Sequence, residues 1–286
     1  MKLIFGLVFG IGCIFGGYVL SGGKMGAILA ALPIKMLIIM GGALGAFIIN
    51  NNPKVLKGAL AGIGAAMKTS KHTKARYLDL LALLYDVLQK ARKEGLMAIE
   101  SDIEKPEDSP LFQKYPAIAA DHHTVEFITD YLRMMVSGNL NAHEIESIMD
   151  SEIETHHNEG HLVAAAYLRL AGALPAFGIV AAVLGVILTM ASVTEPPEVL
   201  GAKIGSALLG AFLGIFLGYA IFEPLGGTLE QKLEEDTKEL QCIKTVLLAS
   251  MQGYPPLTAI EFGRKVLFSN ERPSFAELEG HVKQKK

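Results

Sequence analysis

The hydrophobic positions of the chain gather into four long apolar runs. They cover about residues 3–20, 34–50, 170–193 and 201–223, and more than a hundred polar or mixed residues separate the second run from the third. An α-helix rises about 1.5 Å per residue, so roughly 20 apolar residues cross a bilayer. The pattern predicts four membrane helices in two hairpins. A cleaved signal peptide is the alternative for the first run, but the run is long and lacks an Ala-x-Ala cleavage site.

The two polar stretches also have a helical pattern. Leucines recur at helical spacing between Arg76 and Lys105 and again between Leu229 and Leu247, with no alternating strand pattern. The sequence therefore predicts an all-α polytopic membrane protein, in which the insert between spans two and three and the C-terminal tail form a helical cytoplasmic domain. The predicted divisions are spans one and two in 1–50, the insert in 51–169, spans three and four in 170–223, and the tail in 224–286.

The distribution of charge predicts the orientation. The net charge is −3, from 26 Lys and Arg against 29 Asp and Glu, which gives no basic excess for nucleic-acid binding. Thirteen of the basic residues lie between Asn50 and Leu170 and nine follow Pro224. Loops rich in Lys and Arg stay in the cytoplasm, so we expect both termini and both polar stretches to be cytoplasmic.

Small residues recur every four positions in two of the runs, the first and the fourth. The stripes are Gly210-x-x-x-Gly214-x-x-x-Gly218, Gly201-x-x-x-Gly205 and Gly12-x-x-x-Gly16. Such stripes let helices approach closely, either within one chain or between copies.

Two prolines lie near the predicted inner ends of the last two spans. Pro175 and Pro224 each remove a backbone donor, and each marks either a bend or a helix boundary.

The interiors of the predicted spans carry no ionisable carrier. Asp, Glu, His and Lys inside a membrane usually mark ion or proton pathways, and the middle of the four predicted spans has none. If the protein handles ions, we expect a partner subunit to supply the titrating group.

The polar stretches hold no recognisable catalytic motif. His157 and His161 have the spacing of two metal ligands on one helix face, but no HExxH order or helpful cysteine accompanies them, so a solvated or interfacial face is the preferred interpretation of segment 156–161. Cys13 and Cys242 are isolated and predict no disulfide. We expect no enzyme activity, no cofactor and no metal.

The expected helix from Arg76 to Lys105 has an apolar face and a mixed-charge face. Pairs four residues apart, such as Asp86 with Lys90 and Lys90 with Glu94, stabilise a helix by only a few tenths of a kcal/mol. The charged face is either simply solvated or a docking surface for a charged partner.

Several longer motifs, in this order, carry a resemblance to a known family. They are Asp79-Leu-Leu-Ala-Leu-Leu-Tyr85, Leu174-Pro-Ala-Phe-Gly-Ile-Val-Ala-Ala182, Glu261-Phe-Gly-Arg-Lys265 and Glu271-Arg-Pro-Ser-Phe275. Together with the four-span layout, they make the chain resemble the MotA family of flagellar motor stator subunits over nearly its whole length.

The resemblance implies an assembly and a set of functional residues. Five copies would surround two MotB subunits in the bacterial inner membrane, and MotB would supply the ion-carrying Asp and the peptidoglycan anchor. Arg92 and Glu100 match the charges that engage the rotor protein FliG. Pro175 and Pro224 match the prolines that couple ion passage to motion.

The resemblance also bears on the coupling ion. Sodium-driven relatives carry threonines at the positions of Ala182 and Ala211, and an Ala offers no oxygen to a dehydrating Na⁺. We therefore expect proton coupling. An energising subunit of the ExbB or TolQ type is the alternative within the superfamily; a passive scaffold or a secondary transporter is the alternative from another class.

Overall fold

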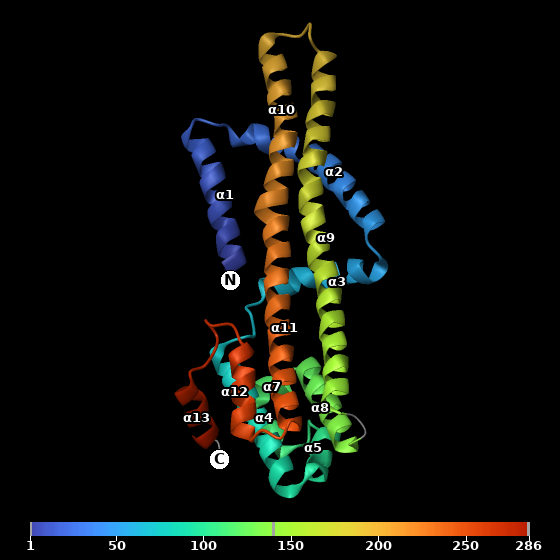
Figure 1. Cartoon of the computed structure of the whole chain (residues 1–286). Helices are drawn as coiled ribbons and strands as arrows, with labels where there is room; N and C mark the ends of the chain where they lie inside the picture. The colour runs from blue at the N-terminus through green and yellow to red at the C-terminus, as the bar shows by residue number, and fades with distance from the viewer. Residues whose placement is uncertain (1, 139–140, 285–286) are drawn as a thin grey trace. The chain divides into compact units, whose positions relative to one another are not determined.

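The computed structural model describes residues 2–138 and 141–284, and this part of the chain contains helices and turns but no β-strand. Figure 1 shows the helices in chain order. Their bounds are α1 Lys2–Leu20, α2 Met25–Asn50, α3 Pro53–Met67, α4 Lys74–Glu94, η1 Leu96–Ile99, α5 Glu100–Glu104, α6 Pro110–Gln113, α7 Pro116–Ala119, α8 His122–Ser137, α9 Ala142–Met190, α10 Pro197–Phe216, η2 Leu217–Phe222, α11 Glu223–Met251, α12 Pro256–Val266 and α13 Phe275–Gln284.

The chain divides into two compact units. Unit 1 comprises Met1–Thr69 and Glu159–Gln231, and unit 2 comprises Ser70–Asn158 and Lys232–Lys286. Helices α9 and α11 each contribute residues to both units. The predicted all-α fold is confirmed.

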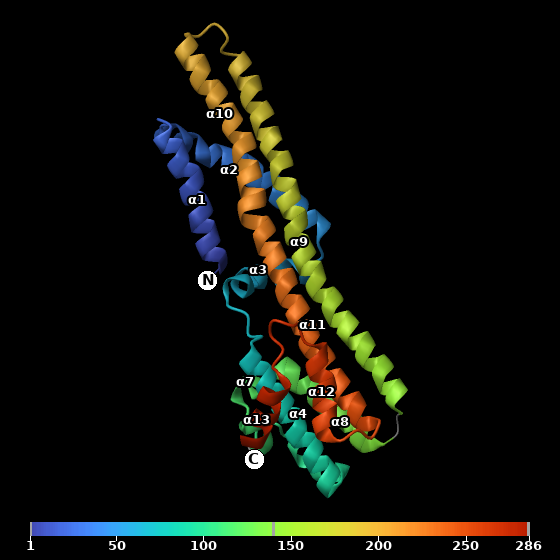
Figure 2. The ribbon, with the colours of Figure 1, turned by 60° about the vertical axis from the view of Figure 1, so that its left-hand side comes forward.

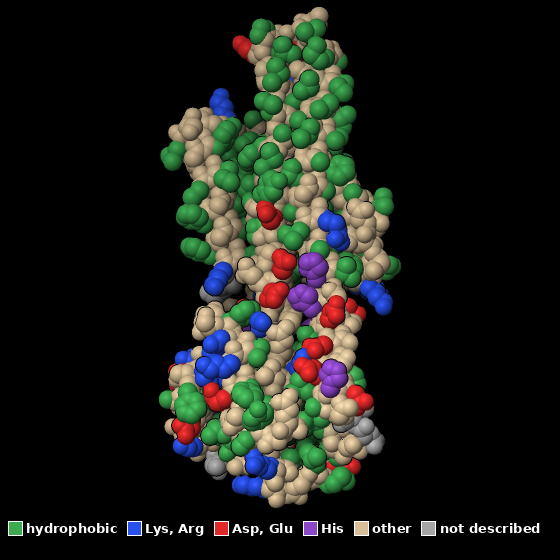
Figure 3. Space-filling model, viewed as in Figure 1, with side chains coloured by type: hydrophobic (Ala, Val, Ile, Leu, Met, Phe, Trp, Pro, Cys, Tyr) green, Lys and Arg blue, Asp and Glu red, His purple; other side chains and the backbone are tan. Residues whose placement is uncertain are grey.

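Unit 1 holds the apolar helices. Among the described residues, four helical stretches are long and apolar enough to cross a membrane: α1, α2, α9, and the continuous helical run from Pro197 to Met251. Hydrophobic side chains cover the visible surface of α1 and α10 (Figure 3), and none of the residues of α1 is buried within the chain. Apolar side chains that face outward in this way fit a lipid environment, so the protein is a multi-pass membrane protein.

Local sequence signals define the helix starts in the region after α2. The Asn52 side chain accepts a hydrogen bond from the Val55 backbone N–H at 2.9 Å, and Pro53 occupies the first turn of α3. The Thr73 hydroxyl accepts in the same way from the Arg76 N–H at the start of α4. These are the usual N-cap residues, which satisfy backbone donors that lack a partner in the first turn.

Unit 2 has a core of large side chains. Tyr77, Tyr115, Tyr131 and Phe112 are completely buried between α4, α6, α7, α8 and α11. Helix α11 ends at Met251, before Gly253, and α6 and α7 begin at prolines.

The helical segment expected from Arg76 to Lys105 is interrupted at Gly95. Helix α4 ends at Glu94 because Gly95 takes a φ of +93°, which glycine adopts readily and other residues rarely do. The chain then turns through η1 into α5. Lys90 consequently pairs with Asp102 across this turn at 2.7 Å, instead of with residues of its own helix.

Candidate functional site

Helices α9 and α10 run side by side in both ribbon views (Figures 1 and 2) and approach each other at glycines. A Cβ atom on Gly214 would lie 2.6 Å from both the Gly178 Cα and the Leu174 carbonyl oxygen. One on Gly210 would lie 2.9 Å from the Ala182 nitrogen. These distances leave no space for a side chain, so the stripe that begins at Gly210 is a packing stripe within the chain.

The two predicted ion-path alanines lie at the same level of this helix pair. Ala182 on α9 packs against Gly210, the residue that precedes Ala211 on α10. Both alanines are half-buried in the isolated chain. Their side chains present only methyl groups, so neither can donate an oxygen ligand to a cation.

Both predicted coupling prolines lie inside continuous helix rather than at helix ends. Pro175 is in the interior of α9, and Pro224 is the second residue of α11, the helix that directly follows the π-helical segment η2. Proline lacks the N–H and its ring clashes with the carbonyl four residues earlier, and a wider π turn accommodates this conflict.

The π-helical segment η2 meets Pro175 of α9 at one glycine. Gly218 lies within η2, and a Cβ atom there would lie 3.1 Å from Cδ of Pro175 and 2.6 Å from the Ala171 carbonyl oxygen. The π segment that precedes Pro224 therefore packs directly on the proline of α9. The sequence alone did not indicate this juxtaposition.

One lysine lies where no ionisable residue was expected. Helix α2 begins at Met25, well before residue 34, so Lys35 lies within the helix instead of at its edge. Its ammonium donates a hydrogen bond to the Ala181 carbonyl oxygen at 3.0 Å, and the residue is only 7% exposed. The apolar residues upstream of Pro33 were the sequence signal that the helix begins before residue 34. Pro33 lies inside helix α2 and does not end it.

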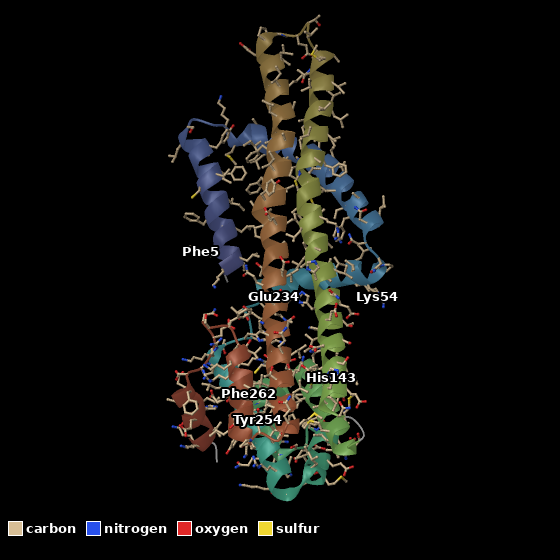
Figure 4. All side chains as sticks on the ribbon, in the orientation of Figure 1. Phe5, Lys54, His143, Glu234, Tyr254 and Phe262 are labelled. Atoms are coloured by element: carbon tan, nitrogen blue, oxygen red, sulfur yellow. The ribbon has the colours of Figure 1, made fainter. Side chains whose placement is uncertain are left out.

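The predicted rotor-contact charges lie on either side of the Gly95 turn in unit 2. Arg92 is in the last turn of α4, Glu100 begins α5, and both are exposed. Arg92 also lines a cavity of about 420 Å³ with apolar walls from α4, η1, α8 and the segment between α11 and α12. Tyr254, another residue of its wall, stacks edge-on against Phe262 of α12, with ring centroids 5.0 Å apart (Figure 4).

A buried charge network joins three segments of unit 2. The Arg76 guanidinium of α4 donates hydrogen bonds to Glu239 of α11 at 2.7 and 2.8 Å and to Asp121 at 2.6 Å. His72 lies 2.9 Å from both Asp236 and Glu239. The sequence did not predict this network, because Asp236 and Glu239 lie three residues apart on a helix that carries several other charged residues.

The network shifts the pKa values of its members. Burial alone would lower the pKa of His72, but hydrogen bonds to Asp236 and Glu239 outweigh burial and raise that pKa to about 9. Burial would raise the pKa of Glu239, but the Arg76 and His72 hydrogen bonds hold it well below its usual range. Both groups are therefore charged at neutral pH, and each stabilises the other.

The histidines of segment 156–161 do not converge on one point. His157 lies 3.1 Å from the Thr237 hydroxyl, His161 lies 3.7 Å from Glu230, and the His156 ring stacks against His123 with centroids 4.3 Å apart. Within residues 2–138 and 141–284, no group of three or more His, Cys, Asp or Glu side chains is arranged to hold a metal ion.

Two family models match separate parts of the chain. Residues 4–95 match the model for the motility protein A N-terminal region, and residues 119–242 match the model for the MotA/TolQ/ExbB proton channel family. Motility protein A of Salmonella typhimurium is 48% identical over 283 residues, which cover 99% of this chain and 95% of that protein. Chemotaxis protein LafT of Vibrio parahaemolyticus is 38% identical, with 98% and 97% covered.

Solved structures share the fold. The flagellar MotAB stator complex from Bacillus subtilis contains a chain that matches with a TM-score of 0.74 and 27% identity, over 90% of this chain and 92% of that one. The structure of C. jejuni MotAB matches with a TM-score of 0.79 and 24% identity, over 96% and 98%.

These matches define first a class of protein, a multi-pass subunit of the MotA/TolQ/ExbB proton channel superfamily. Within that class the chain belongs to the motility protein A family of flagellar stator subunits, which are not enzymes. The 48% identity to motility protein A extends over 99% of this chain, which decides against an ExbB- or TolQ-type subunit.

Proposed function

We propose that this chain forms a proton-conducting stator with MotB and converts ion flow into torque on FliG. The observation that carries the proposal is the glycine-packed α9–α10 pair, which holds Ala182 and Ala211 at one level and presents methyl groups there. Spans 170–193 and 201–222 contain no Asp or Glu, so the carboxylate that carries the proton must come from another chain. Relatives of this family have been solved as MotAB complexes.

The proposed setting is the bacterial inner membrane, with both termini in the cytoplasm. Twenty-two of the 26 basic residues lie between Asn50 and Leu170 or after Pro224, which favours this orientation by the positive-inside rule. The divisions 1–50 and 170–223 then lie in the bilayer, and 51–169 and 224–286 lie in the cytoplasm. Five copies around two MotB subunits is the proposed stoichiometry, which the mass of the purified complex tests.

Pro175 and Pro224 are proposed to couple ion passage to motion. The contact of Gly218 with Pro175 supports this role, because a change of bend in either helix must be accommodated by the other. Replacing either proline by Leu or Ala should leave the assembled complex intact and abolish rotation. Loss of assembled protein in proportion to lost rotation would instead make both prolines structural.

The coupling ion provides the sharpest test of the proposed function. Na⁺ must exchange most of its water for fixed oxygens, whereas a proton needs only the partner's carboxylate. Rotation speed at fixed membrane potential should be insensitive to external sodium and should fall when a protonophore collapses the gradient. Steep sodium dependence that persists with the protonophore would overturn proton coupling.

A further inference from the structure

Lys35 is a buried cation inside the apolar helices of unit 1. It projects from α2 toward the place where α9 and α10 pack, and α2 crosses this pair in both ribbon views (Figures 1 and 2). A Cβ atom on Gly185 would lie 2.8 Å from the Lys35 Nζ and 2.8 Å from the Ala207 Cα. The ammonium therefore occupies a space that exists because both neighbouring helices have a small residue at this level.

Burying this ammonium without a carboxylate partner costs free energy, so the charge calls for a functional explanation. A lysine inside a bilayer is expensive and rare, and its ammonium has three donors to satisfy. Among the described residues, Lys35 makes one hydrogen bond, to the Ala181 carbonyl oxygen at 3.0 Å. Simple helix packing would be served as well or better by Met or Leu at this position.

The hydrogen-bonded carbonyl lies beside the proposed ion path. Ala181 immediately precedes Ala182, which is level with Ala211. Where side-chain hydroxyls are missing, backbone carbonyls are the remaining oxygen ligands of this chain for a hard cation. The ammonium of Lys35 already occupies one of these carbonyls, and its charge opposes a second cation in a region of low dielectric constant.

We propose that Lys35 is a tethered cation that excludes Na⁺ from the α9 backbone beside Ala182, and so acts as a specificity-determining residue for proton coupling. The inference rests on the proposed function, since it requires the α9–α10 pair to flank the ion path. It adds an active exclusion of sodium to the mere absence of hydroxyl ligands.

The test measures rotation speed against external sodium in cells whose own copy of the gene is deleted. Membrane potential, external pH and ionic strength are held constant by replacing sodium with potassium. Lys35→Met removes the charge and the donor, Lys35→Gln removes the charge and keeps a donor, and Lys35→Arg keeps the charge. Lys24→Met is the matched control, because Lys24 is an exposed lysine immediately before the same helix.

We expect sodium to slow rotation in both neutral variants, with a half-inhibiting concentration at least about tenfold lower than in the unmodified protein, because a unit charge at short range is worth more than a factor of ten in affinity. Lys35→Arg and Lys24→Met should match the unmodified protein. Copurification of each variant with its membrane partner establishes assembly.

Failure of the Lys35 proposal and failure of proton coupling give different results in this experiment. Identical sodium curves for the unmodified protein and an assembled neutral variant would overturn the role of Lys35 and leave proton coupling intact. A requirement for sodium in the unmodified protein would overturn the proposed proton coupling itself.

Discussion

Unit 1 and unit 2 are packed by different means. In unit 1 the α9 and α10 backbones touch at Gly178 and Gly214, where even a single Cβ atom has no space. In unit 2 the core is made of tyrosines, phenylalanines and leucines, and a network of buried charges joins α4 to α11. The difference follows from the surroundings, because between lipid-facing helices burial of apolar side chains gives little driving force and close backbone contact has to replace it.

The comparison also shows where charge is tolerated. The buried ions of unit 2 form a network in which Arg76 and His72 oppose Asp121, Asp236 and Glu239. Among its described residues, unit 1 instead keeps a single buried lysine, whose ammonium donates to a backbone carbonyl. A balanced network can be structural, whereas an isolated buried charge calls for a functional reason.

The largest expected effect comes from filling the backbone contact of unit 1. Gly214→Val places a branched side chain where a Cβ atom already meets Gly178 and Leu174 at 2.6 Å. We expect a loss greater than the roughly 3 kcal/mol at the upper end of ordinary overpacking, and so loss of folded protein from the membrane. Gly205→Val is the control on the same helix, because nothing lies within 4 Å of its added Cβ. Equal membrane levels of the two variants would contradict backbone packing at Gly214.

The second prediction tests whether the Arg76–Glu239 pair stabilises unit 2 by itself or only prevents an unpaired buried charge. Arg76→Met should destabilise the unit by about 3–5 kcal/mol because it leaves the Glu239 carboxylate without its main partner, and Arg76→Met with Glu239→Met should recover at least half of this loss. Alkylation of Cys242, which is fully buried, reports opening of unit 2 in a Cys13→Ser background.

The matched control for this pair is Lys74→Met. Lys74 lies on the same helix, and its ion pair with Glu277 is exposed, so its loss should cost no more than about 1 kcal/mol. If the double variant is as unstable as Arg76→Met alone, the ion pair itself holds α4 to α11, and the instability of Arg76→Met does not come from an unpaired Glu239.

The pH dependence of unit 2 is the third prediction. The pKa of His72 is about 9 in the folded chain, above its ordinary value of 6.5, so protonated His72 stabilises the fold fully below pH 6.5 and this contribution is lost as pH rises through 9. The loss amounts to about 3 kcal/mol for a side chain as buried as this one.

The rate of Cys242 alkylation is divided by the rate in the unfolded chain at the same pH, which removes the intrinsic pH dependence of the thiol. This ratio should rise between pH 6.5 and 9. His72→Gln should remove this rise. His143→Gln should keep it, because His143 is exposed at the start of α9 (Figure 4). An unchanged pH profile in His72→Gln would exclude His72 as the titrating group.

The smallest effect is expected at the surface of unit 2. Arg92 and Glu100 are exposed, and exposed ion pairs contribute only about 0–1 kcal/mol each, so neutralising either should reduce swimming modestly without opening unit 2. Reversing both charges should reduce it further, and charge reversal on FliG should restore torque. If the double charge-reversal variant swims like the unmodified protein, Arg92 and Glu100 lie on a solvated surface that makes no rotor contact.

Part of this architecture could be predicted from residue patterns alone. The apolar runs, the glycine stripe at 210, 214 and 218, and the prolines that begin α6 and α7 act locally, so helix class and packing stripes follow from spacing. The family could also be identified, because long motifs in a fixed order are specific. The break at Gly95 was harder to predict, since a glycine inside a helical pattern ends the helix only where the following segment packs elsewhere.

Contacts between residues far apart in the chain were decided by the tertiary structure. Lys35 meets Ala181 across 146 positions, and Arg76 meets Glu239 across 163. No periodicity encodes such pairs, because each depends on which helix faces pack and on how much space small neighbours such as Gly185 leave. The sequence by itself therefore determined the helices, the membrane class and the family of this protein. The fold alone decided which charges are buried, what balances them, and where a cation lies beside the proposed path, because burial is a property of packed surfaces and not of local sequence.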